Sequence, residues 1–218
     1  MTSKPPQAGQ AFFDRIPSQS NAEADKCRDL YDEWASAYDQ DLQHESHGYV
    51  GPQEAARAVA KHGVKDGLAV LDAGCGTGLS GVAVKEVVGA DVVVDGVDLS
   101  TGMLEVARKK NVYRKLEAAD LSKPLGIEDG AYGAVVCVGT LTEGHVGPVP
   151  ALREFARVTA SGGVIVATIK ESVWKNEGHD MEVQRLEREG AVRVQSTALA
   201  PYRAAQDVKA VLLTMVKT

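Results

Sequence analysis

The segment Val70-Leu71-Asp72-Ala73-Gly74-Cys75-Gly76-Thr77-Gly78 decides the fold of this 218-residue chain. It begins as an apolar strand and runs into a turn of alternating glycines, after which a helix is expected to start near Leu79. Glycines at such a turn let the backbone pass close to a ligand where a Cβ would collide. In an open parallel sheet that ligand lies beyond the carboxyl ends of the strands. The segment therefore predicts a ligand site on a strand-to-helix turn.

Apolar runs alternate with helical stretches on both sides of this turn. The predicted strands are Leu68–Asp72, Val92–Val97, Val112–Ala118, Ala134–Val138 and Val164–Ile169. The predicted helices are Pro52–Gly63, Leu79–Val88, Thr101–Lys110 behind an N-cap at Ser100, and Pro150–Val158. Strands that alternate with helices of this length form βαβ units, which give a parallel sheet covered by helices on both faces.

The carboxyl-terminal part of the chain has a different pattern. A predicted helix, His179–Glu189, precedes two strand-like segments, Ala191–Leu199 and Val208–Lys217, joined by a short loop that holds Pro201, Tyr202 and Arg203. So short a link does not allow a crossover, so these two strands should pair antiparallel. The predicted fold is α/β: a Rossmann-like, doubly wound, mostly parallel seven-stranded sheet with an antiparallel carboxyl-terminal pair.

The amino-terminal part is expected to lie outside the core. Residues 1–25 are rich in Ser, Pro, Gln and Asn and are predicted to be mobile, so the folded domain is placed at 26–218. Within it, 26–50 is interpreted as a helical lid, because Tyr31, Trp34 and Tyr38 fall at helical spacing on one face. An ordinary core-facing helix explains that face equally well.

Composition and charge exclude several classes of protein. The net charge of −6 argues against nucleic acid as a partner, since phosphate binding favours a basic surface. Three cysteines without regular spacing favour a reducing compartment, and the scattered histidines indicate no metal site. Nothing resembles a signal peptide or a membrane span, so cytoplasmic localisation is expected. The oligomeric state is not indicated.

Two cofactor classes compete for the glycine turn. Gly76-x-Gly78-x-x-Gly81 satisfies the dinucleotide fingerprint, with Asp98 downstream to bind a ribose. The alternative spacing, Gly74-x-Gly76-x-Gly78 preceded by Asp72, suits an adenosine that carries methionine. Asp72 would help hold the amino end of the methionine, directly or through water, whereas it would repel a pyrophosphate.

Further features favour the methionine-bearing adenosine. Asp98 ends the second predicted strand, where its carboxylate can accept from both ribose hydroxyls, and Asp120 follows the third, placed to accept from the adenine amino group. The antiparallel carboxyl-terminal pair is not how a dinucleotide domain usually ends. The Tyr-x-x-x-Lys pair of short-chain dehydrogenases is also absent after the fourth predicted strand.

Taken together, these motifs resemble those of the class I S-adenosylmethionine-dependent methyltransferases. The resemblance covers residues from about Tyr31 to the end and is carried by 70–78, 95–104 and 157–163. Within the class, 31–41 and 138–146 more closely resemble the methyltransferase-like group of the Williams–Beuren syndrome region. Tyr132-Gly133 and Ser161 depart from common forms of the motifs, and the family's Asn/Asp-Pro-Pro-Tyr motif, used on nucleobase amino groups, is absent.

The resemblance implies S-adenosylmethionine as cofactor and S-adenosylhomocysteine as product. It also implies that Tyr31, Trp34 and Tyr38 lie near the methionine end of the cofactor. The predicted cofactor-binding residues are Tyr31, Trp34, Tyr38, Asp72, Ala73, Gly74, Cys75, Gly76, Gly78, Asp98, Leu99, Met103, Ala119, Asp120, Leu121, Val138 and Gly139.

The chemistry of methyl transfer leaves few marks that identify the acceptor. Because the methyl group is already activated, the protein needs to align the reactants and supply at most one general base. His145, beside Glu143, is the candidate base, although an ordinary loop histidine explains it as well. Thr140, Thr142, Trp174 and Tyr202 are candidate substrate-binding residues.

A small-molecule acceptor with an oxygen, sulfur or nitrogen nucleophile, such as a secondary metabolite, is the preferred interpretation. A cofactor-binding protein that transfers no methyl group and a protein methyltransferase remain alternatives, because fold and cofactor do not fix the chemistry.

Overall fold

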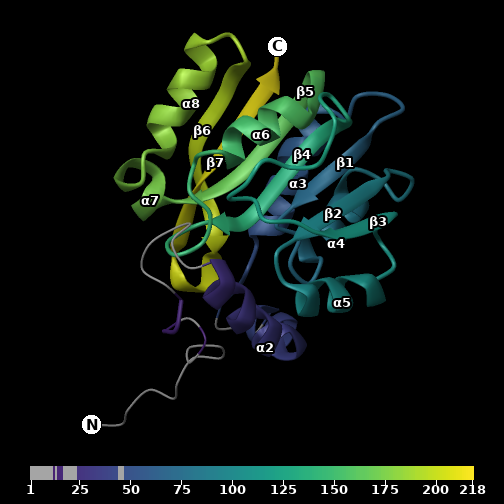
Figure 1. Cartoon of the computed structure of the whole chain (residues 1–218), viewed down its shortest axis with the longest axis vertical. Helices are drawn as coiled ribbons and strands as arrows, with labels where there is room; N and C mark the ends of the chain where they lie inside the picture. Colours follow the sequence, from purple (N-terminus) through teal and green to yellow (C-terminus); the bar gives the residue numbers. More distant parts are fainter. Residues whose placement is uncertain (1–11, 13, 17–23, 44–46) are drawn as a thin grey trace.

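The fold is a seven-stranded sheet with helices on both faces (Figure 1). The computed structural model describes residues 12, 14–16, 24–43 and 47–218. The strand order is β3-β2-β1-β4-β5-β7-β6, in which β1 to β5 run parallel and β7 pairs antiparallel with both β5 and β6. The strand order reverses between β1 and β4, and this is where a ligand is expected.

The elements follow one another along the chain as the sequence pattern predicts, with two helical additions. The strands are β1 Ala69–Ala73, β2 Val94–Asp98, β3 Lys115–Ala118, β4 Tyr132–Leu141, β5 Thr159–Lys170, β6 Val192–Arg203 and β7 Val208–Lys217. The helices are α2 Ala24–Gln43, α3 Gly51–His62, α4 Leu79–Val87, α5 Thr101–Lys109, α6 Ala151–Val158, α7 Glu171–Asn176, α8 His179–Arg188 and the short 3₁₀ turn η1 Ala204–Gln206.

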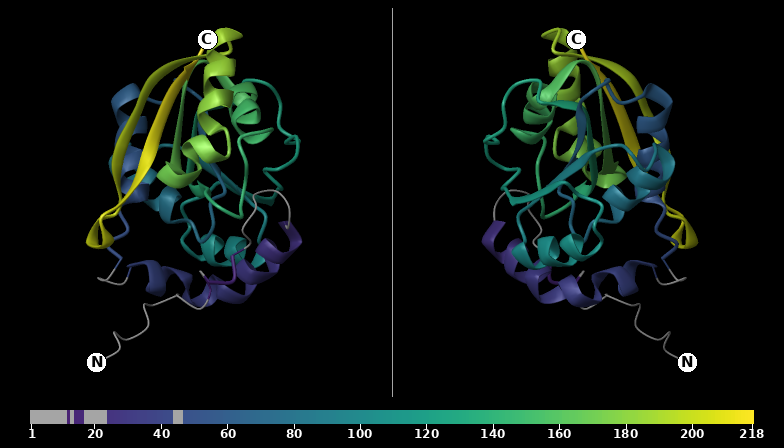
Figure 2. Two further views of the ribbon diagram at one scale, coloured as in Figure 1. Left: turned by 90° about the vertical axis from the view of Figure 1, so that its left-hand side faces the viewer. Right: turned by 90° about the vertical axis from the view of Figure 1, so that its right-hand side faces the viewer.

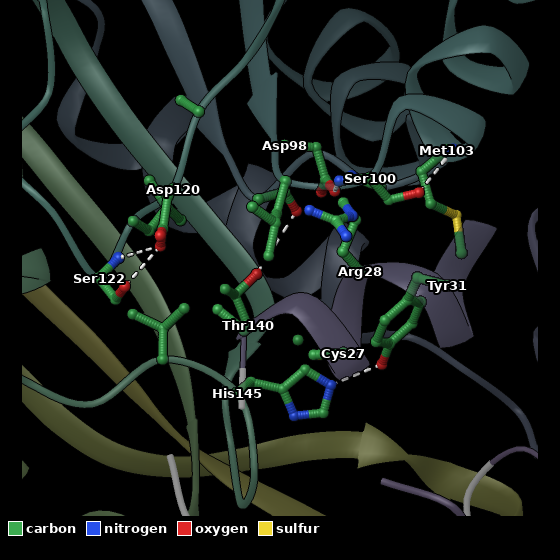
Figure 3. A pocket seen from close by; sticks show the side chains of 18 of the residues that line it. Cys27, Arg28, Tyr31, Asp98, Ser100, Met103, Asp120, Ser122, Thr140 and His145 are labelled. Atoms are coloured by element: carbon green, nitrogen blue, oxygen red, sulfur yellow. Dashed lines mark hydrogen bonds between the residues drawn. The ribbon is translucent and has the colours of Figure 1, made fainter. Parts of the chain in front are cut away.

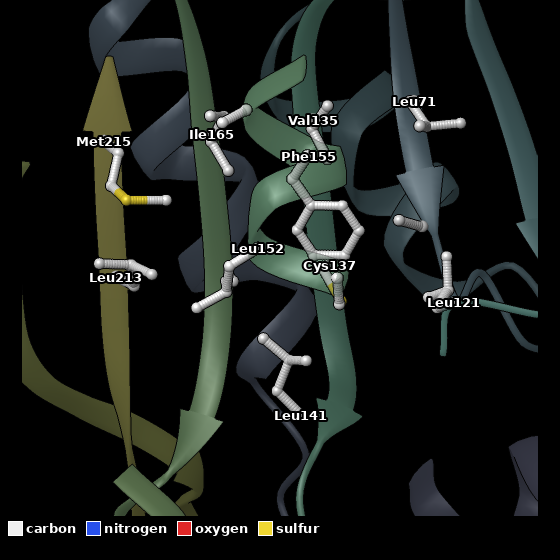
Figure 4. Packing of buried hydrophobic residues seen from close by; sticks show 14 of the residues in the cluster. Leu71, Leu121, Val135, Cys137, Leu141, Leu152, Phe155, Ile165, Leu213 and Met215 are labelled. Carbon is white, nitrogen blue, oxygen red and sulfur yellow. The ribbon is translucent and has the colours of Figure 1, made fainter. Parts of the chain in front are cut away.

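Alternate residues of the central strands contribute to two separate apolar layers, because successive side chains of a strand point to opposite faces. On one face, Val70 and Val136 pack with Ala56 of α3 and Val84 of α4. On the other, Leu71, Val135 and Ile165 pack with Leu152 and Phe155 of α6 (Figure 4). Helices cover both faces of the sheet, and they leave the carboxyl ends of the parallel strands as the place for a site.

Helix α2 lies at those carboxyl ends rather than on either face of the sheet. Figures 1 and 2 show it beside α5, at the end of the molecule opposite the carboxyl terminus. Two carboxylates of α2 attach it there. Asp32 accepts hydrogen bonds from the Ser100 hydroxyl at 2.5 Å and the Gly102 amide at 2.8 Å, and Asp39 accepts from Thr77 and Lys110.

The predicted helix ends are confirmed where a capping residue marks them. Ser100 precedes α5, and its hydroxyl accepts from the Met103 amide at 3.0 Å. Pro52 lies in the first turn of α3, and Gly63 ends that helix with φ +82°. The expected antiparallel pairing of the last two strands is also present.

Three sequence predictions about elements are wrong. The supposed loop Pro201-Tyr202-Arg203 belongs to β6, which is an edge strand and so tolerates a residue without an amide hydrogen. Helix α7 is missing from the prediction. The strand predicted at Val164–Ile169 begins earlier, at Thr159, so that residues 161–163 lie inside β5 as an irregularity, with Gly162 at φ +81°.

The expectation that residues 1–25 are mobile falls mostly outside the described residues. Among the described helices, none is both long and apolar enough to cross a membrane.

Candidate functional site: a cavity at the carboxyl ends of β1 to β4

A cavity lies where the glycine turn meets α2 (Figure 3), with roughly 760 Å³ of empty space when the solvent-open region at its mouth is included. Its walls come from α2, from the turns that follow β1, β2 and β3, and from the end of β4 and the loop after it. Fourteen of the residues predicted from the sequence line it: Tyr31, Tyr38, Gly74, Gly76, Asp98, Leu99, Met103, Ala119, Asp120, Leu121, Val138, Gly139, Thr140 and His145.

The glycine turn is held open by backbone hydrogen bonds. The amides of Gly74 and Cys75 both donate to the Val97 carbonyl, at 2.8 and 3.0 Å, so the turn after β1 is anchored to the end of β2. Gly76 has φ +52°, and a Cβ built on it would meet no atom within 4 Å. Since Gly76 lines the cavity, a side chain there would project into the open space. The turn is thus a cradle that a Cβ would fill.

Asp98 lies at the centre of the polar wall. Its carboxylate accepts from the Gly76 amide at 2.7 Å and from the Ser100 amide at 2.9 Å, so it joins the glycine turn to the start of α5. Burial raises the pKa of Asp98, although these backbone donors oppose the effect. A carboxylate has about four acceptor positions. The hydrogen bonds from Gly76 and Ser100 therefore leave room on the carboxylate for a ligand hydroxyl.

Asp120 forms the second acidic position, one strand further along the sheet edge. It accepts from the amide of Ser122 at 2.9 Å and from the Ser122 hydroxyl at 2.5 Å, and Lys123 lies 2.9 Å away. Burial alone would raise its pKa, but the hydrogen bonds from Ser122 and Lys123 outweigh burial and lower the pKa. Asp120 is therefore an ionised acceptor at neutral pH.

Asp72 occupies a different place from the one expected. It is fully buried and is not among the residues that line the cavity. Its oxygens accept from the Ser80 hydroxyl at 2.9 and 2.7 Å and from the Tyr113 hydroxyl at 2.6 Å. Burial raises the pKa of Asp72 to about 6, with the hydrogen bonds from Tyr113 and Ser80 acting in the opposite direction. Asp72 therefore braces the glycine turn against α4.

The aromatic face of α2 is divided between the cavity and the interior. Tyr31 and Tyr38 line the cavity, whereas Trp34 between them is fully buried. The Trp34 ring stacks on Phe12 at 5.0 Å, and its indole nitrogen donates to Asp41 at 2.7 Å. Two tyrosines of this face therefore line the cavity, and Trp34 packs against Phe12. That α2 acts as a lid stays a prediction.

The loop after β4 brings His145 against Tyr31. The Tyr31 hydroxyl lies 2.7 Å from Nε2 of His145, and Nδ1 of His145 lies 2.8 Å from the Glu143 carbonyl oxygen. Because a carbonyl only accepts, Nδ1 carries the proton of the neutral ring and Nε2 accepts from Tyr31. Burial lowers the pKa of His145, against the opposing effect of Glu143, so the ring is neutral at pH 7.

Some of the candidate substrate-binding residues line the cavity and others do not. Thr140 lines the cavity, but Thr142 donates to the Glu143 carboxylate at 3.0 Å and is not part of the wall. Trp174 lies in α7 and packs on the apolar layer. Tyr202 lies behind the wall, its hydroxyl 3.5 Å from that of Tyr49 and close to Gly139.

Three further predicted cofactor residues lie beside the cavity rather than in its wall. Ala73 is buried at the end of β1, and Gly78 is the N-cap of α4. Cys75 lines a smaller neighbouring cavity of about 280 Å³, which shares Tyr38, Gly74, Gly76 and Val138 with the main one.

The sequence prediction missed six residues of the wall, which are Ala24, Cys27, Arg28, Ser100, Ser122 and Val146. Two of them carried a usable signal, because Ser100 and Ser122 each stand two residues after a predicted acid and donate to it. Cys27 also lies one helical turn before Tyr31. Within the described residues, no group of three His, Cys, Asp or Glu side chains is arranged to hold a metal ion.

The fold and the site define a class. Residues 70–163 match a family model described as a methyltransferase domain. The chain is also similar to human methyltransferase-like protein 27, with 34% identity over 167 residues, which is 74% of this chain and 66% of that protein. The chain belongs to the class I S-adenosylmethionine-dependent methyltransferase family, and S-adenosylmethionine is the cofactor of that family.

Two further comparisons agree with this assignment. Demethylmenaquinone methyltransferase of Staphylococcus aureus (strain MRSA252) is 34% identical over 113 residues, which is 50% of this chain and 46% of that protein. The chain thus spans about half to two thirds of the length of these relatives. Magnesium protoporphyrin IX methyltransferase from Synechocystis PCC 6803, solved with bound S-adenosylmethionine, shares the fold with a TM-score of 0.64 and 19% identity, over 91% of this chain and 100% of that one.

Proposed function

We propose that this chain transfers the methyl group of S-adenosylmethionine to a small-molecule acceptor with an oxygen, sulfur or nitrogen nucleophile. The observation that carries the proposal is the pair of acids, Asp98 at the end of β2 and Asp120 just after β3, which line one cavity with the Gly76 cradle. Carboxylates are strong acceptors for ribose hydroxyls and for an adenine amino group. The cavity therefore suits an adenosine whose sulfur end lies toward the glycine turn.

The residues of the chain divide the work of binding. Asp98 would hold the ribose, and Asp120 with the backbone of Ala119 and Leu121 would read the adenine edge. Tyr31 and Tyr38 close the cavity from α2 and would exclude water from the methyl group. When bound, S-adenosylmethionine supplies a methyl group already activated by a positive sulfur. The protein supplies alignment, which contributes on the order of 7–11 kcal/mol to lowering a barrier of this kind.

Two features support a small acceptor over a macromolecule. Helix α2 forms one wall of the cavity through Cys27, Tyr31 and Tyr38, which limits the access of a large partner from that side. The net charge of −6 disfavours a polyanion as the substrate. The name of the Staphylococcus aureus relative also specifies a small molecule, demethylmenaquinone, as its substrate. The protein is expected to act in the cytoplasm.

Methyl transfer is tested with S-adenosylmethionine labelled in the methyl group. The full chain is incubated with the labelled donor and whole-cell extract, and the products are separated into small molecules, protein and nucleic acid. We expect label in the small-molecule fraction that depends on the chain. Label only in protein would make it a protein methyltransferase. No label in any fraction would mean that the chain binds the cofactor without transferring its methyl group.

A further inference from the structure

Tyr31 and His145 are joined across two elements at one side of the cavity. Tyr31 comes from α2 and His145 from the loop after β4, and both line the cavity. Figure 3 shows the two rings pointing toward each other, apart from Asp98 and Asp120. The 2.7 Å contact between the Tyr31 hydroxyl and Nε2 is the only hydrogen bond described between them. A lone histidine base would need Nε2 free, but here Tyr31 occupies it.

The direction of this hydrogen bond follows from the Glu143 carbonyl. Since Nδ1 donates to that carbonyl at 2.8 Å, Nε2 has only a lone pair in the neutral ring, and the Tyr31 hydroxyl must donate to it. The tyrosine oxygen keeps its own lone pairs. It is therefore able to accept a proton from a ligand in the cavity while it passes its own proton to His145.

We propose that Tyr31 and His145 act as one proton-accepting unit for the methyl acceptor, with Tyr31 as the residue that touches it and His145 as the final proton acceptor. The proposal rests on the proposed function. It assigns the acceptor a phenolic or enolic hydroxyl, because the O–H bond of such a group is acidic enough to give up its proton through Tyr31 to a neutral imidazole as the oxygen bonds the methyl carbon.

The proton and electron balance of the step is complete within this unit. The acceptor O–H bond breaks and its proton moves to the Tyr31 oxygen, while the proton of Tyr31 moves to Nε2 of His145. The acceptor oxygen uses its electron pair to bond the methyl carbon, and the electrons of the broken carbon–sulfur bond stay on sulfur. The positive charge thus passes from sulfur to the imidazole. His145 returns its proton to water after the products leave.

The charged and titratable groups around the pair fit this role. Glu143, in the same loop, favours the imidazolium form of His145, and Lys170 of β5 opposes it. Lys170 is held by the Glu143 carboxylate at 2.9 Å. Burial raises the pKa of Tyr31 in α2 well above its usual value. Tyr38 and Cys27 of the same helix, Tyr202 of β6 and Asp98 of β2 act in the same direction. Tyr31 therefore stays protonated before the reaction and serves as a relay.

The arrangement of the pair is tested by ¹⁵N NMR on the full chain saturated with S-adenosylhomocysteine. We expect His145 to be neutral at pH 7, with Nδ1 protonated and Nε2 unprotonated. Protonation on Nε2 in the neutral ring would overturn the proposal, because Tyr31 would then have no acceptor for its proton. His62→Gln, at the exposed end of α3, helps to assign the signals without altering the site.

The catalytic role is tested by pH profiles of methyl transfer to the labelled small-molecule fraction. The wild-type rate should fall as the pH drops through the His145 pKa, which lies below 6.5 because of burial. We expect His145→Gln and Tyr31→Phe each to lose about 10²–10⁴-fold in rate, and the double variant to lose no more, since general-base catalysis contributes that much. The low-pH limb should be absent in His145→Gln.

A purely structural role for the pair would give a different result. The variants would then bind S-adenosylhomocysteine more weakly or melt at lower temperature, and transfer would keep the wild-type pH profile. Transfer by the wild type that neither variant changes would overturn the relay alone. Absence of transfer by the wild type would overturn the proposed function, and the relay with it, whatever the tautomer.

Discussion

Asp98 and Asp72 lie near the carboxyl ends of adjacent strands, yet they have different roles. Asp98 lines the cavity and keeps acceptor positions beyond its two backbone donors, whereas Asp72 is buried against Ser80 and Tyr113. The difference comes from the residues around them. Only Asp98 has both a glycine cradle on one side and a helix start on the other, so only Asp98 is presented to a ligand.

Replacing Asp98 by Asn should weaken cofactor binding without unfolding the chain. A charge-assisted hydrogen bond contributes about 1.5–3 kcal/mol. We therefore expect Asp98→Asn to raise the Kd for S-adenosylhomocysteine at least about tenfold in titration calorimetry, with unchanged circular dichroism. The exposed Asp91→Asn is the matched control and should bind as the wild type does. Equal affinities for the two variants would contradict the ribose contact.

The sequence predicted most of the residues that line the cavity, because most of them stand at or just after the carboxyl ends of strands. It could not predict which way a side chain turns there. Asp72 and Trp34 were expected near the cofactor, but both are buried, since partners distant in sequence (Tyr113 for one, Phe12 for the other) draw them inward. Such long-range pairs leave no mark on local spacing.

At the scale of elements, α2 forms one wall of the site, and we propose that it acts as a lid. Asp32 bonds the start of α5, and Asp39 bonds both Thr77 of the glycine turn and Lys110 after α5. The glycine turn and the start of α5, to which α2 is hydrogen-bonded, are also the two segments that Asp98 joins. A bound cofactor would therefore lie beneath a helix whose side-chain hydrogen bonds to the glycine turn and to α5 are polar and, at the Asp39–Lys110 pair, partly exposed. Such contacts open more readily than a packed core.

Removing both carboxylates of α2 should speed the release of cofactor. We expect Asp32→Asn with Asp39→Asn to increase the dissociation rate of S-adenosylhomocysteine roughly tenfold, equivalent to about 1.4 kcal/mol. Stopped-flow displacement measures this rate, and thermal melting checks that the sheet core is intact. Glu33→Gln is the control, because that side chain is exposed and paired with Arg15 on the outer side of α2. A large drop in melting temperature with an unchanged rate would make α2 a structural helix and not a lid.

Elements with strong local signals were predicted well. Ser100, Pro52 and Gly63 mark helix ends by capping chemistry, and β4 and β5 contain the apolar runs 134–138 and 164–167. The prediction failed where the signal depends on position in the sheet. Pro201 indicates a loop in isolation, but at the edge of the sheet, beside β7, it fits within β6.

At the scale of the whole molecule, the order of strands creates the site. β1 lies between β2 and β4. The chain runs from β1 outward through β2 to β3 and then crosses to β4 on the other side of β1, so the glycine turn faces an open crevice. The fold class followed from the alternation of strands and helices and from the short link before the last strand. The identity of the methyl acceptor could not be predicted from the sequence. Aligning the donor and the acceptor depends on the shape of the cavity and requires few particular side chains.

The central claim is that Asp98 and Asp120 bind the ribose and the adenine of one adenosine whose sulfur end lies on the glycine turn. A crystal structure of the full chain with S-adenosylhomocysteine tests it most directly. The predicted result is a ribose within hydrogen-bond distance of Asp98, an adenine beside Asp120 and the sulfur near Gly74 and Gly76. An empty cavity, or one that takes a nicotinamide dinucleotide in place of S-adenosylhomocysteine, would contradict the claim.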